Sequence, residues 1–141
     1  MNARMVKAAT EEERSYIGKY TFRPLETNPF TDNDQVMENR NLLVSFIIAN
    51  ECILANTWFK KQDRLLSTYR TPGTEQNAVR ERPNFEQLDY MIVPKRWRNA
   101  ITNAEADDEV NINTDHFPII VTCRISLRRI LNIEEPTSTT K

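Results

Sequence analysis

The stretch FPIIVTCRISL, residues 117–127, is the part of the sequence that most clearly predicts the fold. The odd positions hold Phe117, Ile119, Val121, Cys123, Ile125 and Leu127, whereas Thr122, Arg124 and Ser126 take even ones. Successive side chains of a strand point to opposite faces, so this alternation predicts a half-buried strand with one face in a core. His116, the one histidine of the chain, directly precedes this strand and should turn away from the core face.

The segments upstream predict one helix and several further strands. From Gln35 to Asn50, apolar residues recur at helical spacing, with Leu42 and Ala49 widening the stripe, so the helix should pack against a sheet. Strand-forming residues dominate three later segments, 52–56, 66–70 and 88–93. A helix followed by strands predicts an α/β (α+β) domain. Residues up to 35 and 71–84 are expected to be mainly loops.

Composition narrows the function classes. A chain of 141 residues with 39% hydrophobic residues fits one domain with a core, and a net charge of −1 excludes a generally basic nucleic-acid binder. No run approaches the ~18 apolar residues of a membrane span, and no signal peptide is visible. We expect an intracellular protein, nuclear or cytoplasmic, without a membrane partner. Cys52 and Cys123 stand among apolar residues and should be reduced core thiols.

Three polar residues adjoin the expected strands. Asp89 interrupts an apolar segment, and it either points to solvent or is paired, because burying a lone carboxylate is costly. Asp115 and His116 lie where the chain enters the last strand, and a single histidine is often an ordinary surface residue. Together, however, Asp89 could fix the tautomer of His116 while Asp115 holds a hard cation. Carboxylate, histidine and Mg²⁺ are what water attack on a phosphodiester requires.

A basic segment follows the Asp89 region. Residues 94–99 read PKRWRN and place Lys95, Arg96 and Arg98 around Trp97. Cations interleaved with an aromatic ring suit contact with a nucleic-acid backbone. The other interpretation is a solvated turn whose tryptophan is anchored in the core.

Four segments of the sequence carry a family resemblance: ENRNLLVSFIIANECILANTWF, STYRTPG, EQLDYMIVPKRWRNAI and NTDHFPIIVT. They resemble the second half of the endonuclease/exonuclease/phosphatase superfamily, most closely the endonuclease domains of non-LTR retrotransposons and craniofacial-development-protein-2-like sequences. The resemblance implies the C-terminal half of a four-layered α/β sandwich. Residues 1–128 would form this partial domain and residues 129–141 a disordered tail. It also implies Mg²⁺-dependent (or Mn²⁺-dependent) hydrolysis of phosphodiester bonds.

The resemblance assigns roles to individual residues. Asp89 matches the aspartate that orients the catalytic histidine, His116 matches that histidine, and Asp115 matches a metal-site aspartate. Thr68 matches a residue near the scissile phosphate. Asn2 matches the catalytic asparagine of a GDFNAR-like segment whose aspartate would precede residue 1.

The expected function follows from these matches. The chain is expected to be a fragment of a DNA-nicking endonuclease, with DNA rather than RNA as partner and a possible downstream reverse transcriptase in a full-length element. Its missing N-terminal half would supply the other ligands, so the chain alone should be inactive and prone to associate through uncovered apolar faces. The alternative is a non-catalytic remnant with at most weak nucleic-acid binding.

Overall fold

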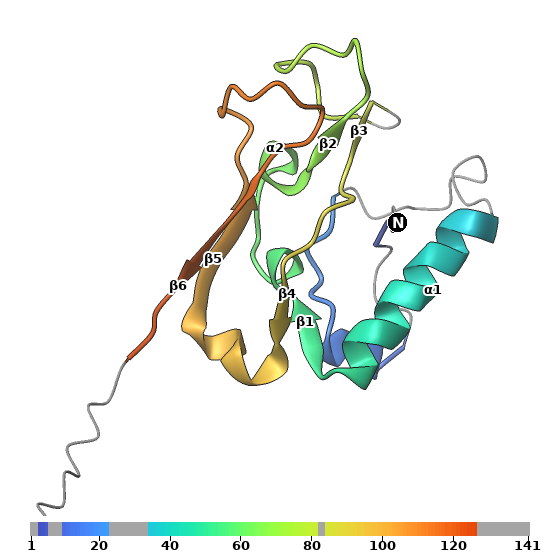
Figure 1. Cartoon of the computed structure of the whole chain (residues 1–141), viewed down its shortest axis with the longest axis vertical. Helices are drawn as coiled ribbons and strands as arrows, with labels where there is room; N and C mark the ends of the chain where they lie inside the picture. Colours follow the sequence, from blue (N-terminus) through green and yellow to red (C-terminus); the bar gives the residue numbers. More distant parts are fainter. Residues whose placement is uncertain (1–2, 6–9, 23–33, 82–83, 127–141) are drawn as a thin grey trace, which may run out of the picture.

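The computed structural model describes residues 3–5, 10–22, 34–81 and 84–126 (Figure 1). These residues form two α-helices, three 3-10 helices and three two-stranded antiparallel sheets. The fold is therefore of the mixed α/β class, as the sequence predicts, and it does not conflict with the C-terminal part of a layered sandwich. In chain order the elements are η1 (Glu13–Ser15), α1 (Asp34–Ala49), β1 (Cys52–Leu54), η2 (Ala55–Thr57), α2 (Asp63–Leu66), β2 (Tyr69–Arg70), β3 (Phe85–Glu86), β4 (Ile92–Pro94), η3 (Lys95–Ala100), β5 (Ile101–Ala106) and β6 (Ile119–Cys123).

Helix α1 confirms the predicted helix but not the breadth of its apolar face. Leu43, Val44 and Ile47 are buried in a core with Ile17 and with Leu54 of β1. Leu42 and Phe46, in contrast, are 55% and 52% exposed. The reason is the 3.6-residue helical repeat, which places residues 43, 44 and 47 on one face and turns residues 42 and 46 out of it.

The strands follow the sequence prediction in part: the predicted strand 52–56 ends at Leu54, the predicted strand 66–70 begins only at Tyr69, and β3 was not predicted. Strand β1 pairs with β4, β2 with β3, and β5 with β6, all antiparallel. The predicted strand over residues 88–93 begins only at Ile92, so Asp89 lies in the segment that leads into β4. Strand β5 was not predicted, because alanine is a weak strand former and Ala104 and Ala106 are the residues that this strand buries.

The alternation in β6 holds only for the first part of the predicted strand. Phe117 is buried, and Ile119 and Val121 are half-buried, as expected. Cys123 and Ile125 are exposed, because β6 pairs with β5 only as far as Cys123, opposite Ile101. The expected core position is therefore wrong for Cys123, whereas Cys52 is half-buried and packs against the α1 core; both are free thiols.

The strands also determine which residues lie at the same end of the molecule. Element η3 leads directly into β5, and the far end of β5 pairs with the start of β6 at Ile119, close to His116. A six-residue strand such as β5 spans about 20 Å at ~3.3 Å per residue. His116 and η3 therefore lie at opposite ends of the β5–β6 hairpin (Figure 1).

Three sequence predictions concern other parts of the chain. Trp97 is 46% exposed, so the interpretation as a core-anchored tryptophan is wrong. The division into residues 1–128 and a tail of residues 129–141 stays a prediction, since 127–141 lie outside the described residues. Within the described part of the chain, no helix is long and apolar enough to cross a membrane.

Candidate active site

The segment that carries His116 is held against the edge of β2. Tyr69 and His116 form an isolated antiparallel bridge. On either side of it, the Arg70 amide donates to the Asp115 carbonyl (2.8 Å), and the Phe117 amide donates to the Thr68 carbonyl (2.8 Å). These main-chain hydrogen bonds hold residues 115–117 in position without relying on side-chain contacts.

Asp89 and His116 meet at this edge. The imidazole Nδ1 lies 2.8 Å from the Asp89 carboxylate Oδ2. A carboxylate only accepts hydrogen bonds, so Nδ1 carries the proton and donates it to Asp89. This leaves Nε2 as the atom available to a ligand. The two side chains are 48% and 41% exposed, so the pair lies at the surface. The expected contact between Asp89 and His116 is confirmed, whereas its catalytic role stays a prediction.

Thr68 and Asn56 hold the backbone of Asp89 in place. The fully buried Thr68 hydroxyl oxygen accepts from the amides of Leu88 (2.9 Å) and Asp89 (3.0 Å). Asn56, also buried, donates its side-chain amide to the Asp89 carbonyl (3.1 Å) and accepts from the Met91 amide (3.2 Å). Thr68 thus positions Asp89, and its contact with a phosphate stays a prediction. Sequence reasoning missed Asn56, for which a polar residue in the strand-like CILAN segment was the available signal.

Asp115 is half-buried next to the pair. It lines a pocket of about 430 Å³ together with Arg70, Asn113 and Thr114, among others. Mg²⁺ requires several oxygen ligands, but the described residues contain no group of three or more His, Cys, Asp or Glu side chains that could hold a metal. Asp115 and its described neighbours therefore do not by themselves fit Mg²⁺. Asn2 lies outside the described residues.

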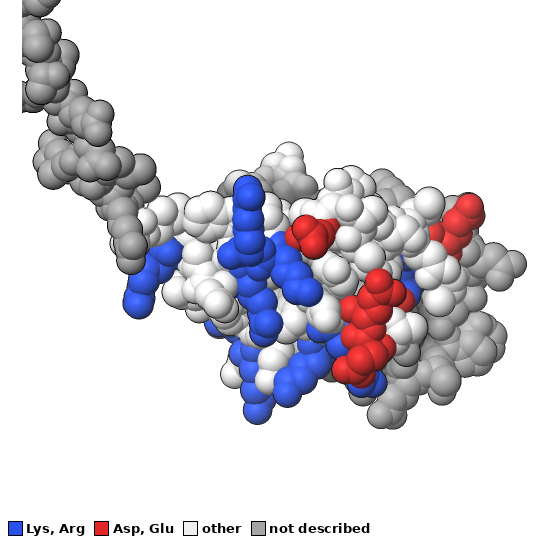
Figure 2. All heavy atoms as spheres, turned by 90° about the horizontal axis from the view of Figure 1, so that it is seen from below, with Lys and Arg blue, Asp and Glu red and all other residues white. Residues whose placement is uncertain are grey.

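The predicted nucleic-acid contacts lie elsewhere. Lys95, Arg96 and Arg98 are exposed on η3, at the end of the β5–β6 hairpin opposite His116. Figure 2 views the molecule from below and shows Lys and Arg side chains gathered on this side. The structure thus separates the basic residues from the Asp89–His116 pair by about the 20 Å length of a six-residue strand.

A half-exposed imidazole with its tautomer fixed by a carboxylate defines a candidate acid–base or phosphate-binding site on a mixed α/β fold. Two curated proteins are similar in sequence to part of the chain. The chain is similar to craniofacial development protein 2 from Tragulus javanicus, with 28% identity over 94 residues, which are 67% of this chain and 15% of that protein. Craniofacial development protein 2 from Bos taurus is 27% identical over 94 residues, or 14% of its length. No family model and no solved structure matches the chain.

Proposed function

We propose that Asp89 and His116 belong to a phosphodiester-hydrolysing site of the endonuclease/exonuclease/phosphatase type that nicks DNA. The observation that carries this proposal is the 2.8 Å contact between two side chains 27 residues apart. Thr68 supports this contact, because its buried hydroxyl accepts hydrogen bonds from the backbone amides of Leu88 and Asp89. Such support is what a side chain needs to keep a productive orientation.

In this proposal Asp89 orients the imidazole of His116, and the imidazole donates a hydrogen bond to the phosphate. Asp89 accepts the Nδ1 proton and holds the ring of His116, so that Nε2 faces an approaching phosphate oxygen. When the imidazole is protonated, Nε2–H donates to the negative charge that develops on the phosphate. The expected dependence on Mg²⁺ or Mn²⁺ would need ligands from beyond the described residues, because Asp115 and its described neighbours do not by themselves fit the ion.

The substrate contacts belong to the proposal too. A duplex at His116 would reach Lys95, Arg96 and Arg98 only if it followed the length of the β5–β6 hairpin. Their part in the reaction would be long-range attraction of a phosphate backbone, which weakens with added salt. Origin from a retrotransposon and a nuclear or cytoplasmic location are further parts of this proposal.

The proposal is tested by adding a short DNA duplex to the chain and following the imidazole resonances by NMR. His116 is the one histidine, so these resonances need no assignment. We expect saturable shifts of the ring signals that disappear in Asp89→Ala, whose ring is no longer held. Glu109→Gln is the control, because Glu109 is exposed and does not line the Asp115 pocket. Ring signals that do not respond to DNA would contradict the proposal and favour a non-catalytic remnant.

A further inference from the structure

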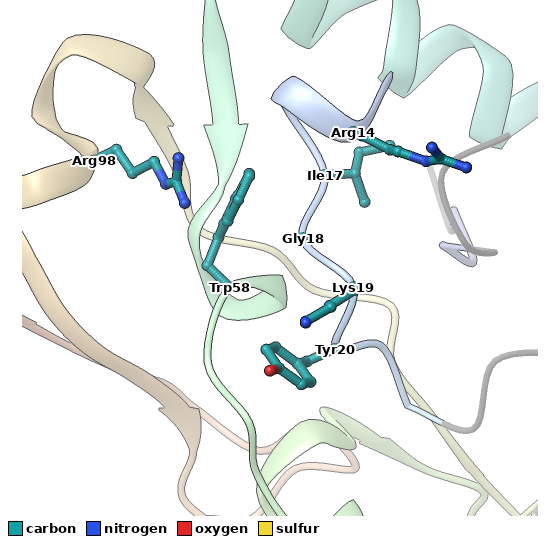
Figure 3. Close-up of a pocket in the computed structure, with 7 residues that line it drawn as sticks. All are labelled: Arg14, Ile17, Gly18, Lys19, Tyr20, Trp58 and Arg98. Carbon is teal, nitrogen blue, oxygen red and sulfur yellow. The ribbon is translucent and has the colours of Figure 1, made fainter. Parts of the chain in front are cut away.

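A second pocket lies away from the Asp89–His116 pair, between the segment 14–20, Trp58 and η3 (Figure 3). Its volume is about 490 Å³, within the range of pockets that hold small organic ligands. Seven residues line it: Arg14, Ile17, Gly18, Lys19, Tyr20, Trp58 and Arg98. Three of the seven are cations and none is a carboxylate, although the chain as a whole has a net charge of −1. The pocket therefore concentrates positive charge.

Two of the three cations face the pocket without a described acidic partner. Lys19 and Arg98 approach Tyr20 and Trp58 from opposite sides, whereas the Arg14 side chain extends away (Figure 3) and pairs with Glu11 at 2.6 Å. Among the described residues, no carboxylate forms an ion pair with Lys19 or Arg98. Their charges are thus available to an anion.

Aromatic rings accompany these cations. The Arg98 guanidinium lies 3.8 Å from the Trp58 ring centroid, and the Lys19 ammonium lies 5.4 Å from that of Tyr20. A guanidinium stacked on an indole keeps its edge free for phosphate oxygens, while aromatic faces stack with nucleobases. Ile17 adds an apolar side to the lining. Cations next to stacking surfaces match a ligand that has both phosphate and an aromatic base.

The walls of the pocket are held in place before any ligand arrives. The Gly18 amide donates to the Thr57 hydroxyl (2.7 Å), and the Tyr20 amide donates to the Thr57 carbonyl (3.0 Å). A Cβ on Gly18 would lie 2.0 Å from the Thr57 carbonyl oxygen, so only glycine permits this approach. A preformed pocket lowers the entropic cost of binding.

We propose that this pocket binds a nucleotide unit, with the base between Tyr20 and Trp58 and the phosphate at Lys19 and Arg98. The unit is either a free mononucleotide or one nucleotide of a single strand, because both present the same chemistry. The site stands apart from the Asp89–His116 pair and does not depend on the function proposed for that pair.

The test is a fluorescence titration of Trp58. The chain has two tryptophans, so Trp97→Phe leaves Trp58 as the reporter. Adenosine monophosphate, adenosine and a short single-stranded deoxyoligonucleotide serve as probes. Each is titrated into Trp97→Phe and into the double variant that also carries His116→Ala. We expect saturable quenching by the monophosphate or the oligonucleotide, weaker binding of adenosine, and no effect of His116→Ala. Quenching by the monophosphate identifies a free-nucleotide site, and quenching by the oligonucleotide alone identifies a strand site.

Variants separate the pocket from general basic attraction. Arg98→Gln and Lys19→Gln should each raise the dissociation constant about tenfold or more, the loss expected for a charge-assisted hydrogen bond. Arg124→Gln is the matched control, because Arg124 is exposed, does not line the pocket, and bonds through its amide to Ala100 at the end of η3. Circular dichroism of each variant checks that it is folded. Absence of quenching by every probe, or an equal loss in Arg124→Gln, would overturn the proposal.

Discussion

The imidazole of His116 and the carboxylate of Asp89 are joined at 2.8 Å, although each residue lies in a connecting segment rather than in a strand of a sheet. Their meeting depends on main-chain hydrogen bonds. Residues 115–117 are fixed to β2 and Thr68, and Asp89 is fixed by Thr68 and Asn56. Thr68 therefore contacts both segments. Its carbonyl accepts from the Phe117 amide, and its hydroxyl accepts from the Asp89 amide.

The first prediction concerns the tautomer of His116. Since Asp89 accepts from Nδ1, the neutral ring should carry its proton on Nδ1. Nitrogen-15 NMR distinguishes the two ring nitrogens, and the single histidine gives a single set of signals. In Asp89→Ala the ring should lose this preference. A ring protonated on Nε2 in the unaltered chain would show that the contact does not exist in solution.

A second prediction concerns Thr68. Thr68→Val keeps the shape of the side chain but removes the acceptor of the Leu88 and Asp89 amides. We expect a loss of about 1–3 kcal/mol in the free energy of unfolding, the cost of leaving buried donors unpaired. Thr68→Ser keeps the hydroxyl and should lose less. Denaturant unfolding of both variants measures the difference, and equal losses would mean that the hydroxyl does not hold Asp89.

Parts of the fold and of this site could be predicted from the sequence, and the reasons differ. Helix α1 and the start of β6 were predictable because their buried residues recur with the period of a helix and of a strand, respectively. The Asp89–His116 contact was predictable from the family resemblance, whereas the support from Asn56 was not, because its hydrogen bonds join residues 33 and 35 positions apart. Strand β5 escaped prediction because its buried alanines are specified by packing rather than by strand propensity.

A third prediction tests the close approach at Gly18. An added Cβ would meet the Thr57 carbonyl at 2.0 Å, so Gly18→Ala must displace the backbone of one segment. We expect a loss of about 3 kcal/mol, at the upper end of overpacking effects. Gly73→Ala is the control: its φ of +87° is unfavourable for alanine but its surroundings are open. That variant should lose only about 1 kcal/mol. If thermal unfolding gives equal losses, residues 17–20 do not lie against Thr57.

A fourth prediction concerns Glu105 on β5. A hydrogen bond from the Lys61 ammonium, 2.7 Å away, lowers the pKa of Glu105 from its ordinary value of 4.5. A depressed pKa means that the ionised carboxylate stabilises the fold above the unfolded-state pKa, and that this stabilisation is lost as the pH falls through the folded-state pKa. Glu105→Gln should therefore be less stable at pH 7 by at most about 1 kcal/mol, because the pair is partly exposed.

The pH dependence separates this ion pair from simple loss of packing. The difference in unfolding free energy between Glu105→Gln and the unaltered chain should disappear as the pH is lowered well below 4.5. There the Glu105 carboxyl is protonated, so it is uncharged like the glutamine that replaces it. Glu109→Gln, at an exposed position, should show little difference at any pH. A stability difference for Glu105→Gln that persists in acid would rule out the ion pair as its cause.

Nicking of supercoiled plasmid in Mg²⁺ measures the proposed chemistry itself. Residues 1–141 alone should not nick, because the described residues offer Asp115 without enough further ligands for the ion. A fusion that adds the segment preceding the matched region of the bovine relative should nick. In that fusion, we predict that His116→Ala lowers the nicking rate by about 10²-fold or more, while Glu109→Gln, at an exposed position outside the Asp115 pocket, leaves it unchanged. A fusion that fails to nick, or one that nicks equally well without His116, would contradict a phosphodiester-hydrolysing role for the Asp89–His116 pair.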